Sequence, residues 1–304
     1  AIFIKKNKEK PVSEKIDVSK IKAKIKQTLK GGKLEVHKAE ILKQRAPVAN
    51  LPDLAPKKKK EGYILTGIAG LDELFEEGIP KGSTVLVSGG AGSGKTIFCL
   101  QTINYHAKKG EKCFYVSFEE NEIRLKQHMV DFGWAPDKLV KSGKLKIERL
   151  SPFDITRNVD ALLAKEKGEL LIDIDPVILP ANFKPDFIVF DSLTAVASAF
   201  SGKEDSYRIY IEQLFRFFEK LGSTVFLITE TQEVPEMFSS TGAEEFLADG
   251  VIVLYNVKKG DIRESAIEIL KMRGEKHEKK IVAMQITDEG MVVYPEQEVF
   301  EAIN

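Results

Sequence analysis

The sequence is poor in cysteine, with only Cys99 and Cys113 among its 304 residues. Such usage favours a reducing compartment over a secreted scaffold held by disulfides. Apolar runs are also short, and none approaches the roughly 18 residues of a membrane-spanning helix. The opening residues, AIFIKKNKEK, contain too short an apolar stretch for a secretory signal. We therefore expect a cytoplasmic protein without a membrane span.

Aromatic residues are missing between Phe3 and Tyr63, where lysine is abundant instead. Residues 1–60 carry 18 lysines and arginines against 6 aspartates and glutamates, whereas residues 61–304 carry 28 against 40. The formal net charge of zero thus hides a basic extension joined to an acidic body. A short amphipathic helix is expected within the extension. Its lysines could bind nucleic acid phosphates, but without aromatic side chains to stack on bases it is more typical of a solvated tail or a docking arm.

Residues 61–304 alternate short β-branched and aromatic runs with longer segments of helical spacing. Runs such as STVLVSG and DFIVFDS predict strands, and KTIFCLQTINYHAKKG and YRIYIEQLFRFFEKLG predict helices. This alternation predicts an α/β fold with a mostly parallel sheet and helices on both faces. The C-terminal runs SAIEILKMRG and KKIVAMQITDEGMVVY predict antiparallel edge strands. We expect one catalytic domain over residues 61–304, after the basic extension of residues 1–60.

The segment GGAGSGKT lies between a predicted strand and a predicted helix, and it fits the phosphate-binding pattern G-x-x-x-x-G-K-T. Its glycines let successive backbone N–H groups turn toward phosphate oxygens, and the helix N-terminus adds partial positive charge. Lys95 is expected to contact the β- and γ-phosphates, and the Thr96 hydroxyl to ligate Mg²⁺. The sequence therefore predicts a nucleoside triphosphate as the ligand. The predicted binding residues in this loop are Gly89, Ala91, Gly92, Ser93, Gly94, Lys95, Thr96 and Ile97.

Two other predicted strands end in acidic residues. The run FIVFD ends at Asp191, which places a carboxylate where it could hold a Mg²⁺ ion bound to Thr96. The run FYVSFEE ends in Glu119 and Glu120, whose side chains should point to opposite sides if the strand continues through them. We interpret Glu119 as the general base that activates water and Glu120 as its support. The alternative is an ordinary polar strand end.

Six segments together resemble the KaiC-like branch of the RecA-superfamily ATPases. These segments are TGIAGLDELFEEGIPKGSTVLVSGGAGSGKT, SFEE, DFGW, FDSLTAV, EEFLADGVIVL and ILKMRGEKHEKK with the following ITDEG. The resemblance covers roughly residues 62–296 and implies a RecA-like P-loop NTPase core. The first segment is shared with archaeal RadA-type recombinases, whereas KMRGEKH followed by ITDEG indicates the KaiC-like branch.

The resemblance also implies a homohexameric ring with ATP and Mg²⁺ between subunits, and a further protein partner of unknown identity. Lys271 and Arg273, on either side of Met272, match residues that reach the γ-phosphate of the neighbour's nucleotide. His277 and the Thr287–Asp288 pair match positions that contact the same nucleotide, the pair toward its sugar and base. Self-phosphorylating members carry adjacent serine and threonine where Glu245 and Phe246 stand here, so autokinase activity is not expected at that site.

Three functions are compatible with these patterns. The first is a slow, regulatory ATPase that works as a ring. The second is a DNA-handling recombinase or mediator, which would need a positively charged path that the acidic body does not provide. The third is a nucleotide-gated scaffold with negligible turnover. The preference for ATP over GTP comes from the resemblance alone.

Overall fold

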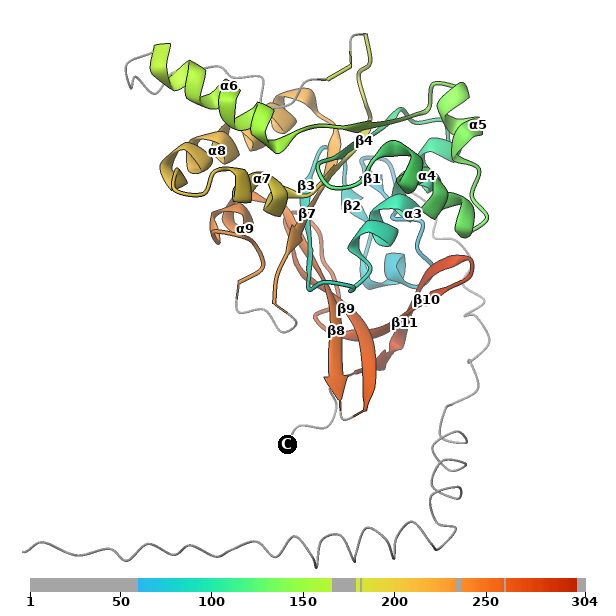
Figure 1. The fold of residues 1–304 in the computed structure, drawn as a ribbon. Helices are drawn as coiled ribbons and strands as arrows, with labels where there is room; N and C mark the ends of the chain where they lie inside the picture. Colours follow the sequence, from blue (N-terminus) through green and yellow to red (C-terminus); the bar gives the residue numbers. More distant parts are fainter. Residues whose placement is uncertain (1–59, 166–178, 181, 233–236, 260, 300–304) are drawn as a thin grey trace, which may run out of the picture. The chain divides into compact units, whose positions relative to one another are not determined.

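The computed structural model describes residues 60–165, 179–180, 182–232, 237–259 and 261–299, all within the unit Leu54–Asn304. These residues form a nine-stranded sheet of order β11-β10-β9-β8-β3-β7-β6-β4-β5 (Figure 1). The predicted α/β fold is confirmed. The amphipathic helix expected within residues 1–60 lies outside the described residues.

Six neighbouring strands, β8-β3-β7-β6-β4-β5, run parallel, so their carboxyl ends share one edge of the sheet. Strand β3 lies inside this group and is buried over its whole length, which suits its apolar run. The parallel strands are β3 (Thr84–Gly89), β4 (Cys113–Ser117), β5 (Leu145–Arg149), β6 (Phe187–Asp191), β7 (Thr224–Glu230) and β8 (Gly250–Lys259).

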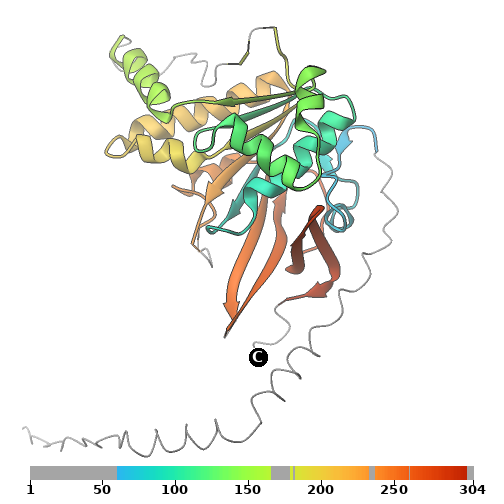
Figure 2. The ribbon, with the colours of Figure 1, turned by 45° about the vertical axis from the view of Figure 1, so that its right-hand side comes forward.

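The C-terminal strands extend the sheet in antiparallel fashion, as the sequence predicts. They are β9 (Ile262–Met272), β10 (Val282–Thr287) and β11 (Gly290–Glu298). Strands β8 and β9 form a long hairpin that projects from the rest of the sheet (Figures 1 and 2). A separate two-stranded sheet pairs β1 (Tyr63–Ile64) with β2 (Ile79–Pro80), and the 3-10 helix η1 (Leu71–Leu74) lies between them in the chain.

Helices cover both faces of the sheet (Figure 2). Helices α3 (Lys95–Lys108), α4 (Glu122–Asp131) and α5 (Pro136–Lys141) pack on one face together with η1. Helices α6 (Pro152–Lys165), α7 (Leu193–Ala199) and α8 (Glu204–Leu221) pack on the other. The short helix α9 (Ala243–Leu247) precedes β8 and contacts α8. The expected long helices are present, whereas the short helices α5, α7 and α9 were not predicted because each has two turns or fewer and gives no clear periodicity.

Candidate functional site

Lys95 begins helix α3, directly after the loop that leaves the carboxyl end of β3. Its side chain is only 8% exposed, and its ammonium lies 3.8 Å from a carboxylate oxygen of Glu230. Lys95 Nζ also donates hydrogen bonds to the carbonyl oxygens of Gly89 at 2.9 Å and Gly90 at 3.0 Å. Burial lowers the pKa of Lys95, and the nearby Glu230 and Asp191 carboxylates oppose this shift. The lysine is thus held inside the loop with its charge directed toward the space that the loop encloses.

The loop has the shape that a bound phosphate group needs. A Cβ atom on Gly89 would lie 2.4 Å from the Leu254 carbonyl oxygen and 2.6 Å from Ser93 Oγ, so only glycine fits there. Gly94 has φ 98°, a left-handed conformation that favours glycine, and it caps α3 without a side chain in front of the helix N-terminus. Ser93 Oγ is buried without a hydrogen-bond partner. A free donor in a glycine-lined loop at a helix N-terminus suits a phosphate ligand.

Thr96 and Asp191 provide the oxygen atoms that Mg²⁺ prefers. Thr96 Oγ1 lies 3.5 Å from Asp191 Oδ2, although 95 residues separate them in the sequence. Tyr115 donates a hydrogen bond of 2.5 Å to the same carboxylate oxygen. Burial raises the pKa of Asp191 to about 6, and the Tyr115 hydrogen bond limits the rise. Together with a nucleotide's phosphates, these oxygens could hold one magnesium ion.

Glu119 and Glu120 follow the end of β4, and their side chains diverge. Ser192 Oγ donates a hydrogen bond of 2.6 Å to Glu119 Oε1, which directs this carboxylate toward the end of β6. Glu120 Oε2 instead lies 3.0 Å from His128 Nε2 and 3.0 Å from Arg124 Nε, both on α4. The two carboxylates thus have different partners, but β4 already ends at Ser117 and both residues line one cavity, so strand alternation does not place them on opposite sides. Their assignment as base and support stays a prediction.

A cavity of about 440 Å³ brings most of these groups together. Its lining includes eight of the predicted site residues: Gly92, Gly94, Lys95, Thr96, Ile97, Glu119, Glu120 and Asp191. Seven other lining residues were not predicted as site residues: His128, Asp131, Phe132, Ser192, Ile228, Glu230 and Ile286. Phe132 belongs to the DFGW segment that contributed to the family resemblance, but nothing in the sequence indicated that it lies in the site. Ile286 comes from the distant strand β10, which no local pattern connects with the loop.

Lys271 and Arg273 lie outside this cavity and bind helix α9 instead. Lys271 Nζ donates to the carbonyl oxygens of Glu245 at 2.9 Å and Ala248 at 2.7 Å. Arg273 donates to those of Phe246 at 2.6 Å and Leu247 at 3.3 Å. Partial burial and the neighbouring Arg273 lower the pKa of Lys271. The two cations therefore satisfy carbonyl groups at the C-terminal end of α9.

Strand register places these cations away from the glycine-rich loop of the same chain. Lys271 in β9 pairs with Val251, at the amino end of β8. Strand β8 runs parallel to β3, and Gly89 at the carboxyl end of β3 pairs with Leu254. The two cations and the loop therefore lie toward opposite ends of the parallel strands, separated by at least about 10 Å of strand.

The remaining predicted residues also lie outside the cavity lining. Met272 is 5% exposed and packs against Gly250. Both ring nitrogens of His277 are buried without a hydrogen-bond partner, next to Phe75. Thr287 Oγ1 donates a hydrogen bond of 2.9 Å to the Gly290 carbonyl oxygen at the turn between β10 and β11. The next residue, Met291, forms two hydrogen bonds through its backbone with the Gln101 side chain of α3. The assignment of Met272, His277, Thr287 and Asp288 to a neighbour's nucleotide stays a prediction.

Comparison with known proteins identifies the family. The family model described as the KaiC ATPase matches residues 64–298. The chain belongs to the KaiC ATPase family. A KaiC-like protein from Pyrococcus horikoshii has a solved structure that is 32% identical, with a TM-score of 0.63, and the match covers 77% of this chain and 99% of that one. The predicted resemblance to single-domain KaiC-like proteins and the RecA-like fold are thereby confirmed.

The curated relatives differ in length. A UPF0273 protein from Thermotoga maritima is 34% identical over 243 residues, which covers 77% of this chain and 96% of that protein. The circadian clock oscillator protein KaiC of Acaryochloris marina is 32% identical over 241 residues, covering 76% of this chain but 44% of that protein. The matched region of this KaiC family member thus corresponds to less than half of the clock protein. Within the described residues, no helix combines the length and apolarity that crossing a membrane requires.

Proposed function

We propose that this KaiC family member binds ATP with Mg²⁺ and hydrolyses it. The observation that supports the proposal most directly is the convergence of Lys95, Thr96, Asp191 and Glu119 on one cavity. A cation for the phosphates, two oxygen donors for a metal and a carboxylate for water are the groups that phosphoryl transfer to water requires. The match to the KaiC ATPase family model supports ATP as the nucleotide.

Each of these residues has a separate task in the proposed reaction. Lys95 exchanges its Gly89 and Gly90 carbonyl partners for the β- and γ-phosphate oxygens. Thr96 and Asp191 would hold Mg²⁺, which would supply positive charge against the charge that develops on the phosphates. Glu119 accepts a proton from the attacking water, with Ser192 fixing the orientation of its carboxylate.

We further propose that Lys271 and Arg273 act on the nucleotide of a neighbouring copy, within a ring of identical subunits. They lie toward the amino ends of the parallel strands, whereas the cavity opens beyond the carboxyl ends, so they cannot complete the site of their own chain without a large rearrangement. Cationic side chains supplied by a second subunit stabilise transition-state charge in other P-loop enzymes. Turnover would then depend on assembly, which suits a slow regulatory enzyme.

A subunit-mixing experiment tests both parts of this proposal. Lys95→Ala removes the phosphate-binding lysine, and Arg273→Ala removes a donated cation, so each variant alone should be inactive. In a mixture, an Arg273→Ala subunit keeps an intact loop and can receive Arg273 from a Lys95→Ala neighbour. Random mixing should restore about a quarter of wild-type phosphate release, because half of the sites have an intact loop and half of those receive an arginine.

The outcomes separate the alternatives. No recovery on mixing, with Arg273→Ala alone inactive, would show that Arg273 serves its own chain. Full activity of Arg273→Ala alone would remove it from the reaction. Wild-type protein that assembles with ATP but releases no phosphate would favour the nucleotide-gated scaffold. Autokinase activity is not proposed, because neither the Glu245 nor the Phe246 side chain carries a hydroxyl group.

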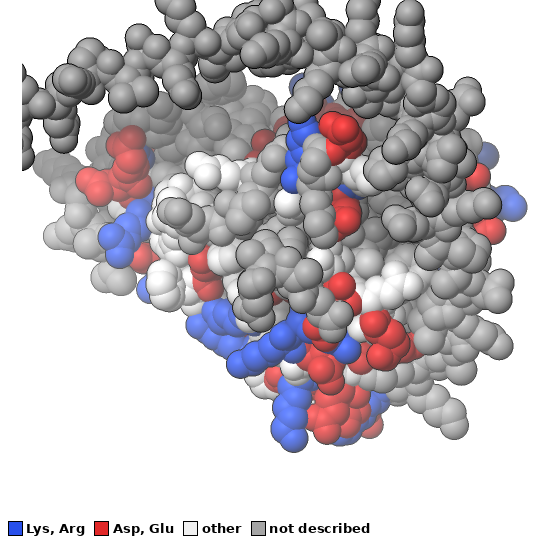
Figure 3. Space-filling view, turned by 90° about the horizontal axis from the view of Figure 1, so that it is seen from below, with Lys and Arg blue, Asp and Glu red and all other residues white. Residues whose placement is uncertain are grey.

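A DNA-handling function receives less support from the charge distribution. In Figure 3, the described lysine and arginine side chains of the lower face lie among aspartates and glutamates rather than in one continuous basic patch. Proteins that bind nucleic acid without reading its sequence present such a patch to the phosphates. Stimulation of phosphate release by DNA, with a steep salt dependence, would reverse this preference. The nucleic acid partner of residues 1–60 stays a prediction.

A further inference from the structure

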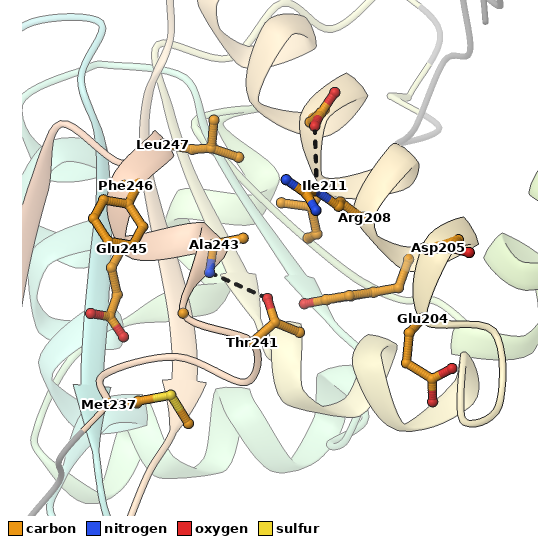
Figure 4. A pocket seen from close by; sticks show the side chains of 13 residues that line it. Glu204, Asp205, Arg208, Ile211, Met237, Thr241, Ala243, Glu245, Phe246 and Leu247 are labelled. Carbon is orange, nitrogen blue, oxygen red and sulfur yellow. Dashed lines mark hydrogen bonds and ion pairs between the residues drawn. The ribbon is translucent and has the colours of Figure 1, made fainter.

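A second and larger hollow lies between the N-terminal half of α8 and the segment that contains α9 (Figure 4). Its volume is about 770 Å³. Ile211 and the apolar parts of Tyr207 line it, and Met237, Phe246 and Leu247 surround it. Phe246 is 78% exposed and Met237 58% exposed, values that are unusual for large apolar side chains. Exposed apolar side chains around a hollow indicate a surface that contacts another molecule.

The charge of this surface, which we call the α8–α9 groove, is negative. Four carboxylates line it, from Glu204, Asp205, Glu212 and Glu245, against the single cation of Arg208. Glu212 is 3.9 Å from Arg208, and Glu245 accepts hydrogen bonds from the Phe238 N–H group at 2.5 Å and from Ser239 Oγ at 3.1 Å. Carboxylates still outnumber cations four to one among the lining residues. The groove is therefore suited to an apolar segment that carries positive charge.

Helix α4 of the same chain has these properties on its exposed side. Ile123 is 80% exposed and Val130 is 50% exposed, and their spacing of seven residues puts them on one face of the helix. Arg124 follows Ile123; it pairs with Glu120 of its own chain at 3.0 Å, and its side chain is still 69% exposed. Helix α4 also borders the nucleotide cavity, since His128 and Asp131 contribute to its lining.

The positions of the groove and of α4 match the arrangement in which Lys271 and Arg273 reach a neighbour's nucleotide. The two cations donate to carbonyl groups of α9, so the groove lies beside them. Helix α4 lies beside the cavity that they would have to reach. Any contact that brings the cations of one copy to the cavity of the next also brings α9 of the first copy near α4 of the second.

We propose that the α8–α9 groove of one copy receives the exposed face of α4 from the next copy, with Ile123 and Val130 covering Phe246 and Leu247. Arg124 then faces the carboxylates of the groove. This inference rests on the proposed function, because it assumes that Lys271 and Arg273 act between copies. In this arrangement the groove sets the position of Lys271 and Arg273. The groove and the neighbour's nucleotide cavity then belong to one interface.

Chemical cross-linking tests the contact. Ile123→Cys and Phe246→Cys are placed in separate full-length chains, which are mixed with ATP and Mg²⁺ and treated with a short bis-maleimide. The native Cys99 and Cys113 are buried and should not react. Cross-linked dimers should form in this mixture but not in either variant alone. A mixture of Phe246→Cys with Phe153→Cys is the control, because Phe153 is 67% exposed on α6 and is not part of either surface.

A second measurement uses the same pair of phenylalanines. Phe246→Ala should weaken ATP-dependent assembly by about tenfold or more, as removal of a central aromatic side chain does at other interfaces. Phe153→Ala should leave assembly unchanged. Both variants should retain ATP binding at low protein concentration, which shows that they fold.

The results distinguish this inference from the function on which it rests. Assembly with ATP and recovery of activity in the subunit mixture, but no specific cross-link and no effect of Phe246→Ala, would overturn the contact and leave the proposed function intact. Such a result would assign the groove to another protein. Failure of the wild-type protein to assemble at all would overturn both.

Discussion

Ser192 and Glu119 connect the ends of two neighbouring strands through a hydrogen bond of 2.6 Å. Ser192 follows β6 and Glu119 lies just beyond β4. The same serine hydroxyl accepts a hydrogen bond of 3.2 Å from the Ala195 N–H group and so caps α7. The orientation of the proposed base is therefore coupled to the start of a helix on the opposite face of the sheet from α3.

Ser192→Ala should reduce the rate of ATP hydrolysis several-fold without a large change in ATP affinity. The variant loses the hydrogen bond that orients Glu119, and it also loses a helix N-cap worth about 1 kcal/mol of folding free energy. Steady-state phosphate release and ATP binding should be measured together. Ser192→Thr is the control, because it keeps the hydroxyl group. Equal turnover of the alanine and threonine variants would contradict an orienting role.

Glu119→Gln should abolish most phosphate release, on the order of a hundredfold or more, because the amide cannot accept a proton from water. Glu120→Gln should have a smaller effect, since Glu120 contacts His128 and Arg124 on α4. Single-turnover hydrolysis and ATP binding of the two variants give the comparison. A larger loss in Glu120→Gln than in Glu119→Gln would reverse the two assignments.

Asp191→Asn should increase the stability of the metal-free protein at pH 7.5. The pKa of Asp191 is raised from 3.8 to about 6 by burial, so the folded state holds a proton that the unfolded state releases at lower pH. The free energy of unfolding therefore falls as pH rises between these two values, and above pH 6 the buried carboxylate lowers it by on the order of 1–3 kcal/mol.

Thermal denaturation in EDTA measures this difference. The stability advantage of Asp191→Asn should be largest above pH 6 and should shrink toward pH 4. Asp137→Asn is the matched control, because the Asp137 side chain is 74% exposed. An advantage that does not depend on pH would contradict the role of the carboxylate charge. The same substitution should weaken magnesium-dependent ATP binding, a cost of function that stabilising changes at active sites often show.

Lys271→Met should increase amide hydrogen exchange around α9. The variant keeps a long apolar side chain but loses the donors to the carbonyl groups of Glu245 and Ala248. The Ala248 N–H group, which donates to Glu244 O at 2.9 Å, is the expected reporter. Lys276→Met is the control, since Lys276 lies in the segment that follows β9 and its side chain is 87% exposed. Unchanged exchange would show that α9 does not depend on Lys271.

The sequence predicted the parts of the fold and site that depend on local patterns. The strands from β3 to β8 follow apolar runs, and the order strand–loop–helix places Lys95 and Thr96 at the start of α3 without further information. Asp191 was predicted from the rule that parallel strands present ligands at their carboxyl ends, and its distance of 3.5 Å from Thr96 agrees with that rule.

Features that depend on contacts between residues far apart in the sequence could not be predicted from the sequence. Ile286 enters the cavity because β10 and β11 fold back beside α3, where a Cβ atom on Gly94 would lie 3.1 Å from it. The binding of Arg273 to the carbonyl of Phe246 also depends on tertiary structure, since 27 residues separate them. Glu230 was overlooked because its strand resembles the other buried strands, and only the structure brings it to 3.8 Å from Lys95.

The cavity and the cations of Lys271 and Arg273 lie toward opposite ends of the parallel strands, and this arrangement limits how copies of the chain can assemble. Each copy would give its cations in one direction and receive them from the other, which is a heterologous contact. In an open row of copies, the cavity at one end receives no cations from a neighbour, and the cations at the other end reach no cavity. When the row closes into a ring, every cavity receives cations, so the rate of hydrolysis per subunit should rise when the last copy joins.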